Sequence, residues 1–429
     1  MSEREWKHYK LGEISDSCLG KMLDKKKNIG VYQPYLANFN VRWGGFDLTN
    51  VQEMKFEDHE DERYSLKPGD LVICEGGEPG RCAIWRDKTI RIKIQKALHR
   101  LRVHEGFNSD FLYYRMFLAG KTGELERHFI GSTIKHLTGI SLKQIGFDFP
   151  CETEQTKISL VLRALDDKIE LNNRINKELE AMAKSLYDYW FVQFDFPFDF
   201  TRGKPDPNGK PYKTSGGKMV YNSTLKREIP EGWEVGVLGD LGEIFGGSTP
   251  PTRERDNFSE KGIPWITPND LSDNGNNVFI SRGLTDVTEK GIKTASLKIA
   301  PAGTVLLSSR APIGYTAIAR NLVTTNQGFK SFIPNKGYSS EFILYAVKIN
   351  LPIIVQNASG STFKEISASV LKALTAILPG QEILKLFDER VTPIFQKINV
   401  LEKQNQQLEQ LRDWLLPMLM NGQVRVVVE

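Results

Sequence analysis

The sequence lacks the features that mark membrane, secreted and zinc-stabilised proteins. None of its 429 residues lie in an apolar run near the roughly 20 residues that a membrane-spanning helix needs. The N-terminal stretch MSEREWKHYK is charged, whereas a signal peptide has an apolar centre. The four cysteines show no C-x-x-C spacing, so we interpret Cys18, Cys74, Cys82 and Cys151 as buried free thiols. These absences predict a cytoplasmic protein with no membrane partner and no metal site.

Motifs of common catalytic sites are also missing. Residues 215–219, SGGKM, have Met where the Ser or Thr of a phosphate-binding P-loop would stand. The stretch GGEPG at Gly76–Gly80 is better explained as a turn between strands than as a dinucleotide-binding loop. The Asn/Asp-Pro-Pro-aromatic motif of adenine methyltransferases is absent, and the six histidines have no metal-ligand spacing. The sequence therefore gives no support to an enzyme with a recognisable site.

Length and charge set the outer limits of the interpretation. One compact core rarely extends beyond about 250–300 residues, so a chain of 429 residues predicts two or more domains. The net charge of +4, from 57 basic and 53 acidic residues, is too small to establish nucleic-acid binding. It permits a basic face that is balanced by acidic surface elsewhere.

An internal repeat is the strongest signal in the sequence. The segment GSTIKHL at Gly131–Leu137 returns as GSTFKEI at Gly360–Ile366, 229 positions later (360 − 131). Other segments return in the same order: WKHYKLGEI as WEVGVLGDL, PGDLVICEGGEPGRCAI as PAGTVLLSSRAPIGYTAI, QKALHRLRV as NQGFKSFIP, and FNSDFLYY as YSSEFILY. We conclude that the chain holds two copies of one domain.

A heptad pattern follows each copy. Its positions in the first copy include Leu162, Leu165, Ile169, Asn172, Asn176 and Leu179. The same offset of 229 gives the positions Val391, Ile394, Ile398, Leu401, Asn405 and Leu408 in the second copy. The pattern predicts two long helices of about 35–40 residues, or roughly 55 Å each. It is typical either of two helices that pair or of an amphipathic helix on a core, and the matching asparagines favour pairing.

Two local features refine this organisation. Pro393 lies inside the second helical pattern, so we expect a kink or a break near Val391. The segment that begins at Thr201 is rich in Gly, Pro and Lys without an apolar period, which predicts a linking loop. The predicted organisation is a domain at 1–150, a helix at 151–200, a linker at 201–230, a domain at 231–379 and a helix at 380–429.

Each globular copy has mixed secondary-structure signals. DLVICE and TVLLSS are typical of buried strands. SDFLYYRMFLAG and SEFILYAVKI are typical of helices, with Ser109 and Ser340 as the expected N-caps. The predicted fold class is therefore α+β: two similar mixed domains, each followed by a long helix.

The order of short motifs resembles a known family, the specificity subunits of type I restriction–modification systems. The similar segments are GGSTP at Gly246, GIPWITPNDL at Gly262, NQGF at Asn326, GSTFKEI at Gly360, AKSLYDYWFVQFDF at Ala183 and LRDWLLPMLMNGQVRV at Leu411. None of these segments is specific by itself. Their order and the duplication together carry the resemblance, which covers nearly the whole chain.

The resemblance implies a non-catalytic reader of double-stranded DNA. Each copy would be a target-recognition domain, and the helices would pack as an antiparallel coiled coil that docks two methyltransferase subunits. Those subunits would use S-adenosylmethionine to modify adenine, and restriction subunits would use ATP and magnesium to translocate and cut. This chain itself would hold no cofactor. A spacer helix of roughly 55 Å equals about 16 base pairs, which predicts a bipartite site. Because the two copies are similar but not identical, the two half-sites should differ, so the site is expected to be asymmetric.

The GST segments are the first candidates for DNA contact. One hypothesis is that their backbone N–H groups and hydroxyls meet a phosphate while a lysine adds charge. The other is a turn and N-cap that close the domain before its last strand. The residues concerned are Ser132, Thr133 and Lys135 in the first copy and Ser361, Thr362 and Lys364 in the second.

Other candidates have equally open interpretations. Arg81 and Arg310 lie in matching loops and could read guanine, or could be solvated loop charges. Asn326 and Gln327 could reach adenine or cap a strand. Lys25–Lys27 is interpreted as a solvated run near phosphates. The aromatic cluster between Tyr187 and Phe200 could stack on bases, although packing of a helix against a domain is the commoner role of such a cluster.

Three alternative functions remain at this stage. A coiled-coil scaffold with two protein-binding domains would have DNA affinity that is insensitive to sequence. An enzyme with an unrecognised site would need acids or histidines paired in both copies, and no such pair is found. A specificity subunit could also serve a methyltransferase without restriction.

Overall fold

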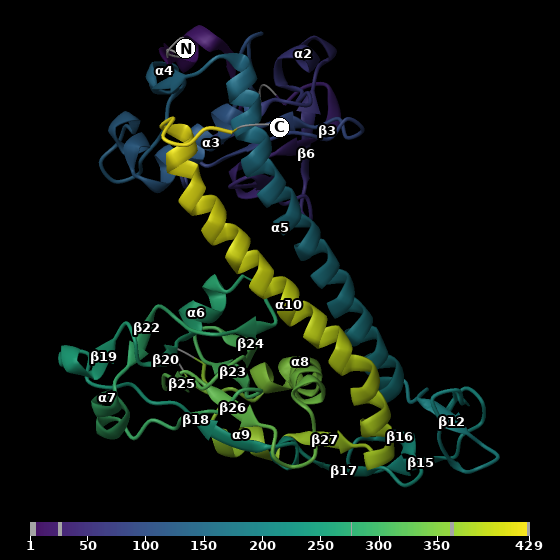
Figure 1. Ribbon diagram of the computed structural model, residues 1–429. Helices are drawn as coiled ribbons and strands as arrows, with labels where there is room; N and C mark the ends of the chain where they lie inside the picture. The colour runs from purple at the N-terminus through teal and green to yellow at the C-terminus, as the bar shows by residue number, and fades with distance from the viewer. Residues whose placement is uncertain (1–5, 25–27, 276, 361–363, 427–429) are drawn as a thin grey trace. The chain divides into compact units, whose positions relative to one another are not determined.

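The computed structural model describes residues 6–24, 28–275, 277–360 and 364–426 (Figure 1). The chain divides into two compact units, residues 1–169 with 407–429 and residues 170–406. Each unit holds one globular copy and part of each of two long helices, α5 (Glu152–Tyr187) and α10 (Gln381–Met420). No helix among the described residues is long and apolar enough to cross a membrane.

The first copy is built on an antiparallel sheet in the order β2-β10-β7-β8. A smaller sheet in the order β6-β3-β9 contains one parallel pair, β3 with β9. Strands β1 and β11 pair at the two ends of the copy. The strands are β1 (Lys7–Lys10), β2 (Ser15–Leu19), β3 (Val31–Leu36), β4 (Val41–Arg42), β5 (Gly45–Phe46), β6 (Gln52–Phe56), β7 (Leu71–Cys74), β8 (Cys82–Ile84), β9 (Lys93–Ile94), β10 (Leu98–Val103) and β11 (Gly146–Phe149).

The second copy repeats this topology, which confirms the internal repeat. Its main sheet has the order β18-β26-β23-β24-β21, its second sheet again contains one parallel pair, β20 with β25, and β17 pairs with β27. Strand β23 is buried along its whole length, as is β7, because both are runs of apolar and small residues. The strands are β17 (Glu234–Val237), β18 (Glu243–Gly246), β19 (Phe258–Ser259), β20 (Ile263–Ile266), β21 (Phe279–Ile280), β22 (Thr285–Val287), β23 (Val305–Ser309), β24 (Ile313–Ala319), β25 (Thr324–Thr325), β26 (Lys330–Ile333) and β27 (Thr375–Leu378).

The N-cap of the main helix in each copy lies one residue earlier than the sequence predicts. Asn108, not Ser109, caps α3 by accepting a hydrogen bond from the Phe111 amide at 3.0 Å. Ser339, not Ser340, caps α8. Both caps have extended backbone, which leaves the following Ser inside the first turn. The shorter helices and these two are α1 (Leu11–Ile14), α2 (Asp61–Tyr64), α3 (Ser109–Lys121), α4 (Gly139–Gln144), α6 (Pro268–Asp273), α7 (Glu289–Thr294), α8 (Ser340–Gln356) and α9 (Ala368–Ala373).

Of the kink or break predicted near Val391 on account of Pro393, the break is wrong, because α10 runs for 40 residues from Gln381 to Met420 without interruption. A proline inside a helix removes one backbone donor and crowds the preceding turn. Here Phe387, Val391 and Phe395 are fully buried on both sides of Pro393, so tertiary packing holds the helix together. Helix α5 has 36 residues and continues into a π-helical turn at Asp188–Val192.

The two long helices pack antiparallel, as the family resemblance implies. Within the second unit Asn172 donates to Asn405 at 2.8 Å, and the ring of Tyr187 lies 6.0 Å from that of Phe387. Residue numbers therefore rise along α5 while they fall along α10. All predicted seam residues are buried or half-buried: Leu162, Leu165, Ile169, Asn176 and Leu179 on α5, and Ile394, Ile398, Leu401, Asn405 and Leu408 on α10.

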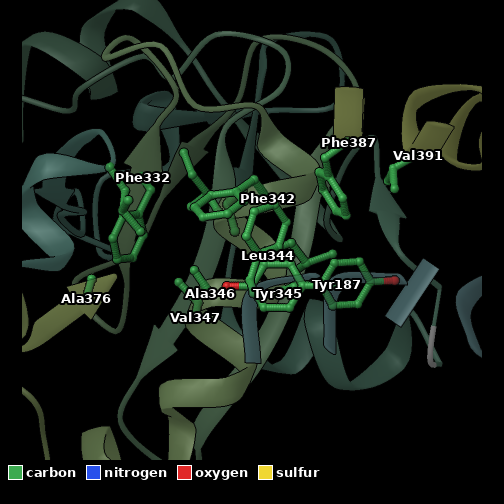
Figure 2. Packing of buried hydrophobic residues seen from close by; sticks show 14 of the residues in the cluster. Tyr187, Phe332, Phe342, Leu344, Tyr345, Ala346, Val347, Ala376, Phe387 and Val391 are labelled. Carbon is green, nitrogen blue, oxygen red and sulfur yellow. The ribbon is translucent and has the colours of Figure 1, made fainter. Parts of the chain in front are cut away.

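The core of the second unit joins its globular copy to both long helices (Figure 2). The ring of Tyr187 from α5 lies 5.4 Å from that of Phe342 in α8, and Phe342 lies 6.3 Å from Phe387 of α10. Further along the chain Trp190 and Phe191 are also buried. The packing interpretation of the aromatic cluster is therefore confirmed for its buried rings, whereas Tyr189 and Phe200 of the same cluster are exposed.

A buried ion pair fixes α10 to the second copy. Glu402 of α10 accepts hydrogen bonds from the Val278 amide at 2.6 Å and the Phe279 amide at 3.2 Å, and it also accepts from Arg320. Burial raises the pKa of Glu402 to about 7 although Arg320 opposes this shift. Because breaking a pair of this kind leaves an uncompensated buried charge, it holds the helix in one register against the domain.

The segment between the helix and the second copy is more ordered than the predicted loop. It contributes β13 (Lys204–Pro205) and β14 (Lys210–Pro211) on either side of β12 (Pro197–Asp199), and a hairpin of β15 (Met219–Asn222) and β16 (Arg227–Pro230). The buried ring of Tyr212 holds this segment in place, because it stacks on Phe196 with the ring centroids 4.6 Å apart.

The prediction of four buried thiols is only partly right. Cys74 and Cys82 are buried, and Cys18 is half-buried. Cys151 is exposed, since it lies directly before α5 at the surface.

Candidate nucleic-acid interface

The residues at the base of the two GST segments pair in the same way. In the first copy Ile130 and His136 exchange two backbone hydrogen bonds of 2.8 Å. In the second copy Ser359 and Glu365 do the same at 3.0 and 2.8 Å, and each residue is its counterpart plus 229. We call the segments 130–136 and 359–365 the GST hairpins. Ser361 and Thr362 lie outside the described residues.

A glycine is required at the start of each hairpin tip. Gly131 has φ +109° and Gly360 has φ +127°, a region that side chains with a Cβ rarely adopt. A Cβ on Gly131 would also lie 2.2 Å from the carbonyl oxygen of Ile134. The repeated glycine is therefore explained by backbone geometry.

Each hairpin is fixed to the end of the central strand of its sheet. The Leu137 amide donates to the Glu75 carbonyl at 2.7 Å, and the Ile366 amide donates to the Ser309 carbonyl at 3.1 Å. Leu137 and Ile366 are fully buried. In the first copy the turn expected for a purely structural role is thus present. The N-caps that follow are Thr138 of α4 and Ser367 of α9, which lie after the Gly-Ser-Thr residues.

The tip of the first hairpin presents polar groups to solvent. Ser132, Thr133 and Lys135 are exposed, and Ile134 beside them is 65% exposed. The Lys135 ammonium lies 3.0 Å from the Glu126 carboxylate, and both side chains are more than half exposed. An exposed pair of this kind is worth less than about 1 kcal/mol, so a phosphate could replace the carboxylate at little cost. Lys364 is likewise exposed.

Three loops meet beside the hairpin of the second copy. The predicted residues Arg310 and Asn326 come together here, since a Cβ on Gly328 would lie 3.0 Å from Asn326 Oδ1 and 3.6 Å from Arg310 Nε. Asn326 Oδ1 accepts a hydrogen bond from the Gly328 amide at 2.8 Å, and Gln327 bonds the Thr249 hydroxyl. The Asn326 oxygen therefore shapes the loop, while its amide nitrogen is left for other contacts.

Glu365 gives this loop cluster its charge pattern. Its carboxylate lies 3.1 Å from Lys330 Nζ and 3.8 Å from the Arg310 guanidinium. Lys330 is largely buried and also lies 3.5 Å from the Ser309 hydroxyl. Two cations thus share one acid at the edge of the hairpin.

The equivalent place in the first copy has other chemistry. Arg81 points inward, donating to the Asn38 carbonyl at 2.9 Å and to Glu78 at 2.7 Å. It is therefore neither a solvated loop charge nor free to meet a base. His99 is buried and donates to the Leu137 carbonyl at 3.0 Å, and burial lowers its pKa.

Sequence reasoning did not single out Lys330, Glu365 or His99. A signal was available, because aligning the repeats places Glu365 on His136 and Lys330 on His99. The two copies share the backbone frame of this site and differ in its polar side chains. Such a pair of sites can make the same kind of contact with two different targets.

Lys25–Lys27 lies outside the described residues. Among the described residues one group, Glu57, His59 and Glu60, brings three possible metal-ligand atoms within 4.8 Å of one another, which the sequence did not suggest. Glu60 already pairs with Lys21, and the other two side chains are exposed.

Comparisons with known proteins agree on one family. The family described as "Type I restriction modification DNA specificity domain" matches the chain twice, at residues 3–181 and 230–410. The HindI specificity subunit of the type I restriction enzyme of Haemophilus influenzae is 28% identical and aligns over 98% of this chain and 100% of its own length. The MjaIX specificity subunit of Methanocaldococcus jannaschii is 41% identical over 46% of each chain, so that match spans about half of either protein.

A solved structure supports the fold. The S subunit of a type I restriction–modification system from M. genitalium is similar with a TM-score of 0.58 at 14% identity, and the alignment covers 100% of this chain and 98% of that one. At this identity the likeness concerns the fold alone. It matches the arrangement of two mixed copies and two long helices seen here.

Proposed function

Because the chain belongs to the type I restriction–modification DNA specificity family, we propose that it reads an asymmetric, bipartite site on double-stranded DNA and directs adenine methylation or cleavage by partner subunits. The observation that carries the proposal is the pair of GST hairpins. Both have one backbone frame, and their neighbouring loops carry different polar side chains. Two different half-sites are the expected consequence.

The contacts fall into two classes. Groups at the hairpin tips, including the Ser132 and Thr133 hydroxyls and the Lys135 and Lys364 ammonium groups, are suited to phosphate oxygens, which position a protein without reading sequence. Arg310 and Asn326 are suited to base edges, because guanidinium and amide groups can recognise guanine and adenine. Arg81 is left out of the second class, since its guanidinium is used inside the domain.

The catalytic chemistry is assigned to other subunits. We propose two methyltransferase subunits that use S-adenosylmethionine and restriction subunits that use ATP and magnesium, all in the cytoplasm. This assignment rests on the family and on the absence of an acid or histidine pair repeated in the two copies. A system without restriction subunits would need the same specificity chain.

The long helices supply a ruler in this proposal. A helix of 36 residues, such as α5, is about 54 Å long at 1.5 Å per residue. That length corresponds to about 16 base pairs at 3.4 Å each. The helix pair would therefore set the length of the untouched spacer between the half-sites.

The deciding experiment is methylation-sensitive sequencing of the host genome with and without this gene. Loss of methyl-adenine from one split, asymmetric motif on deletion is the expected result, and it names the target. If no motif changes while the partner genes are expressed, the proposal is wrong. The coiled-coil scaffold would then be the better explanation, and DNA affinity insensitive to sequence would support it.

A paired substitution tests the role of the hairpin lysines. Lys135→Ala with Lys364→Ala should reduce the slope of log affinity against log salt by about 2, because each lost phosphate contact removes about 0.9. Equilibrium binding to a duplex that holds the site is measured at about six salt concentrations between roughly 50 and 300 mM. The slope is obtained from these affinities. Lys67→Ala with Lys336→Ala removes the same charge outside the hairpins and should leave the slope unchanged. Equal slopes for both double variants would support the purely structural role of the GST segments.

A further inference from the structure

We infer that Glu365 is a specificity-determining residue that competes with DNA for the two cations of the second copy. The inference rests on the proposed function and concerns the second reader alone. In the free protein the Glu365 carboxylate occupies Arg310 and Lys330. DNA that contains the target sequence supplies acceptors that replace the carboxylate. Other DNA has to displace the carboxylate without such a replacement, which weakens its binding.

The main chain of Glu365 is held in place by backbone pairing on both sides. The main chain of Glu365 bridges Ser359 across the GST hairpin and also bridges Arg310 at the end of β23. The next residue, Ile366, is fully buried and bonded to Ser309. The main chain of Glu365 is therefore fixed, and its carboxylate lies 3.1 Å from Lys330 Nζ and 3.8 Å from the Arg310 guanidinium.

The site is open on one side. The side chains of Glu365 and Arg310 are 36% and 34% exposed, whereas Lys330 is only 13% exposed. A ligand can thus reach the carboxylate and the guanidinium directly. It reaches the Lys330 ammonium only after the ion pair between Lys330 and Glu365 is broken. Asn326 lies beside the same guanidinium, so a base that engages Arg310 also meets an amide group.

The first copy has no such competitor. The residue at the position of Glu365 is His136, and the residue at that of Lys330 is His99, which bonds the Leu137 carbonyl. Its loop arginine, Arg81, is held by Asn38 and Glu78 away from the hairpin strand. At this position of the repeat, a carboxylate shared by two cations is therefore a property of the second copy, which indicates that it serves discrimination there rather than the fold that both copies share.

The physical effect is a penalty on non-specific binding. A phosphate that approaches the hairpin meets a carboxylate of the same sign and two cations that are already paired, so few counterions are released. A guanine edge offers two acceptors to Arg310 in a bidentate geometry and can compensate for the lost pair. Repulsion of the wrong partner is an established route to specificity.

The test compares two variants with the same change in net charge. Glu365→Gln removes the competitor, and Glu231→Gln removes an acid that pairs with Lys218 in the β15–β16 hairpin, outside the loop cluster. Each full-length variant is assembled with its methyltransferase partner. Binding is measured on a duplex with the methylated motif and on a scrambled duplex, over a range of salt concentrations.

We expect Glu365→Gln to bind the scrambled duplex several-fold more tightly and with a salt slope steeper by about 1 to 2, one unit for each freed cation. Its ratio of specific to non-specific affinity should fall, whereas Glu231→Gln should match the wild type. Glu365→Asp keeps the charge and should keep most of the ratio. If Glu365→Gln and Glu231→Gln have the same ratio and slope, the inference is wrong while the proposed function stands. A wild-type complex that binds both duplexes equally contradicts the proposed function itself.

A second variant keeps the test decisive if Glu365→Gln does not fold. Lys330→Gln should weaken binding to the specific duplex and leave binding to the scrambled duplex unchanged, because in non-specific complexes the Lys330 ammonium stays paired with Glu365. An equal loss on both duplexes would show that Lys330 is an ordinary phosphate contact and would overturn the inference.

Discussion

His99 links the first GST hairpin to pH through a single buried ring. It is 1% exposed, it donates to the Leu137 carbonyl that follows the hairpin, and burial lowers its pKa below the usual 6.5. Below the unfolded-state pKa the unfolded chain binds a proton that the folded chain resists. The corresponding stability is therefore fully present above pH 6.5 and is lost as the pH falls through the lowered folded-state value.

We predict that the first unit loses stability between pH 7 and pH 5 and that His99→Gln flattens this dependence, because glutamine can keep the donor without gaining a charge. Thermal unfolding of the full chain at a series of pH values measures the effect. His104→Gln, at an exposed histidine, is the control. An equally steep pH dependence in His99→Gln would show that other groups titrate.

Single residues were predictable where the backbone alone decides. Gly131 and Gly360 are repeated because both need positive φ, and this much follows from a repeated turn motif. Arg81 and Arg310 are also repeated, yet one is held inside its domain and the other faces Glu365. The partner of a long side chain depends on residues far away in the sequence, such as Asn38, which no local pattern reveals.

At the scale of elements, the asparagines of the coiled coil break the two-fold repeat. Asn405 pairs with Asn172 and also donates to Asn173 at 2.7 Å. Its counterpart in the repeat is Asn176, whose buried amide oxygen has no hydrogen-bond partner among the described residues, and the counterpart of Asn172 is Leu401. The matching positions seen in the sequence therefore have different roles in the two helices.

This difference predicts opposite effects of one substitution at two sites. Asn176→Leu should stabilise the chain by about 1 kcal/mol, since it removes an unsatisfied buried acceptor. Asn172→Leu should destabilise it by about 1–3 kcal/mol, because Asn405 and Gln404 lose their donor, and this loss outweighs removal of the Asn172 amide oxygen, which also has no partner among the described residues. Urea unfolding monitored by helical circular dichroism measures both. Equal losses in the two variants would mean that Asn176 has a partner, such as ordered water.

Packing also decided the continuity of the helices. Local rules predict an interruption at Pro393, but α10 continues because the apolar residues around Pro393 are buried in the second unit. The Arg320–Glu402 pair adds a polar anchor nine residues after Pro393 (402 − 393 = 9). Propensity is a weak prior for a helix that is held by tertiary contacts on this scale.

At the scale of the whole molecule, the ruler proposal makes a quantitative prediction. Removing one heptad from α5 together with the facing heptad of α10 shortens the pair by about 10 Å, which should shorten the spacer by about 3 base pairs or abolish activity. Genome-wide methylation in a strain that carries the variant gives the new motif directly. A control that replaces the same heptads with others of equal length should keep the original spacer. An unchanged spacer after the deletion would refute the ruler.

The sequence by itself determined the duplication, the mixed character of each copy, the two long helices and the family. These depend on patterns that repeat along the chain, such as heptads and GST segments at a shared offset of 229. Only the tertiary structure decided how polar side chains are used: Glu365 between Arg310 and Lys330, and Asn405 with Asn172 instead of a symmetric partner. The physical reason is that a hydrogen bond or an ion pair depends on distances of a few ångströms between residues that the fold brings together, and repetition in sequence does not fix those distances.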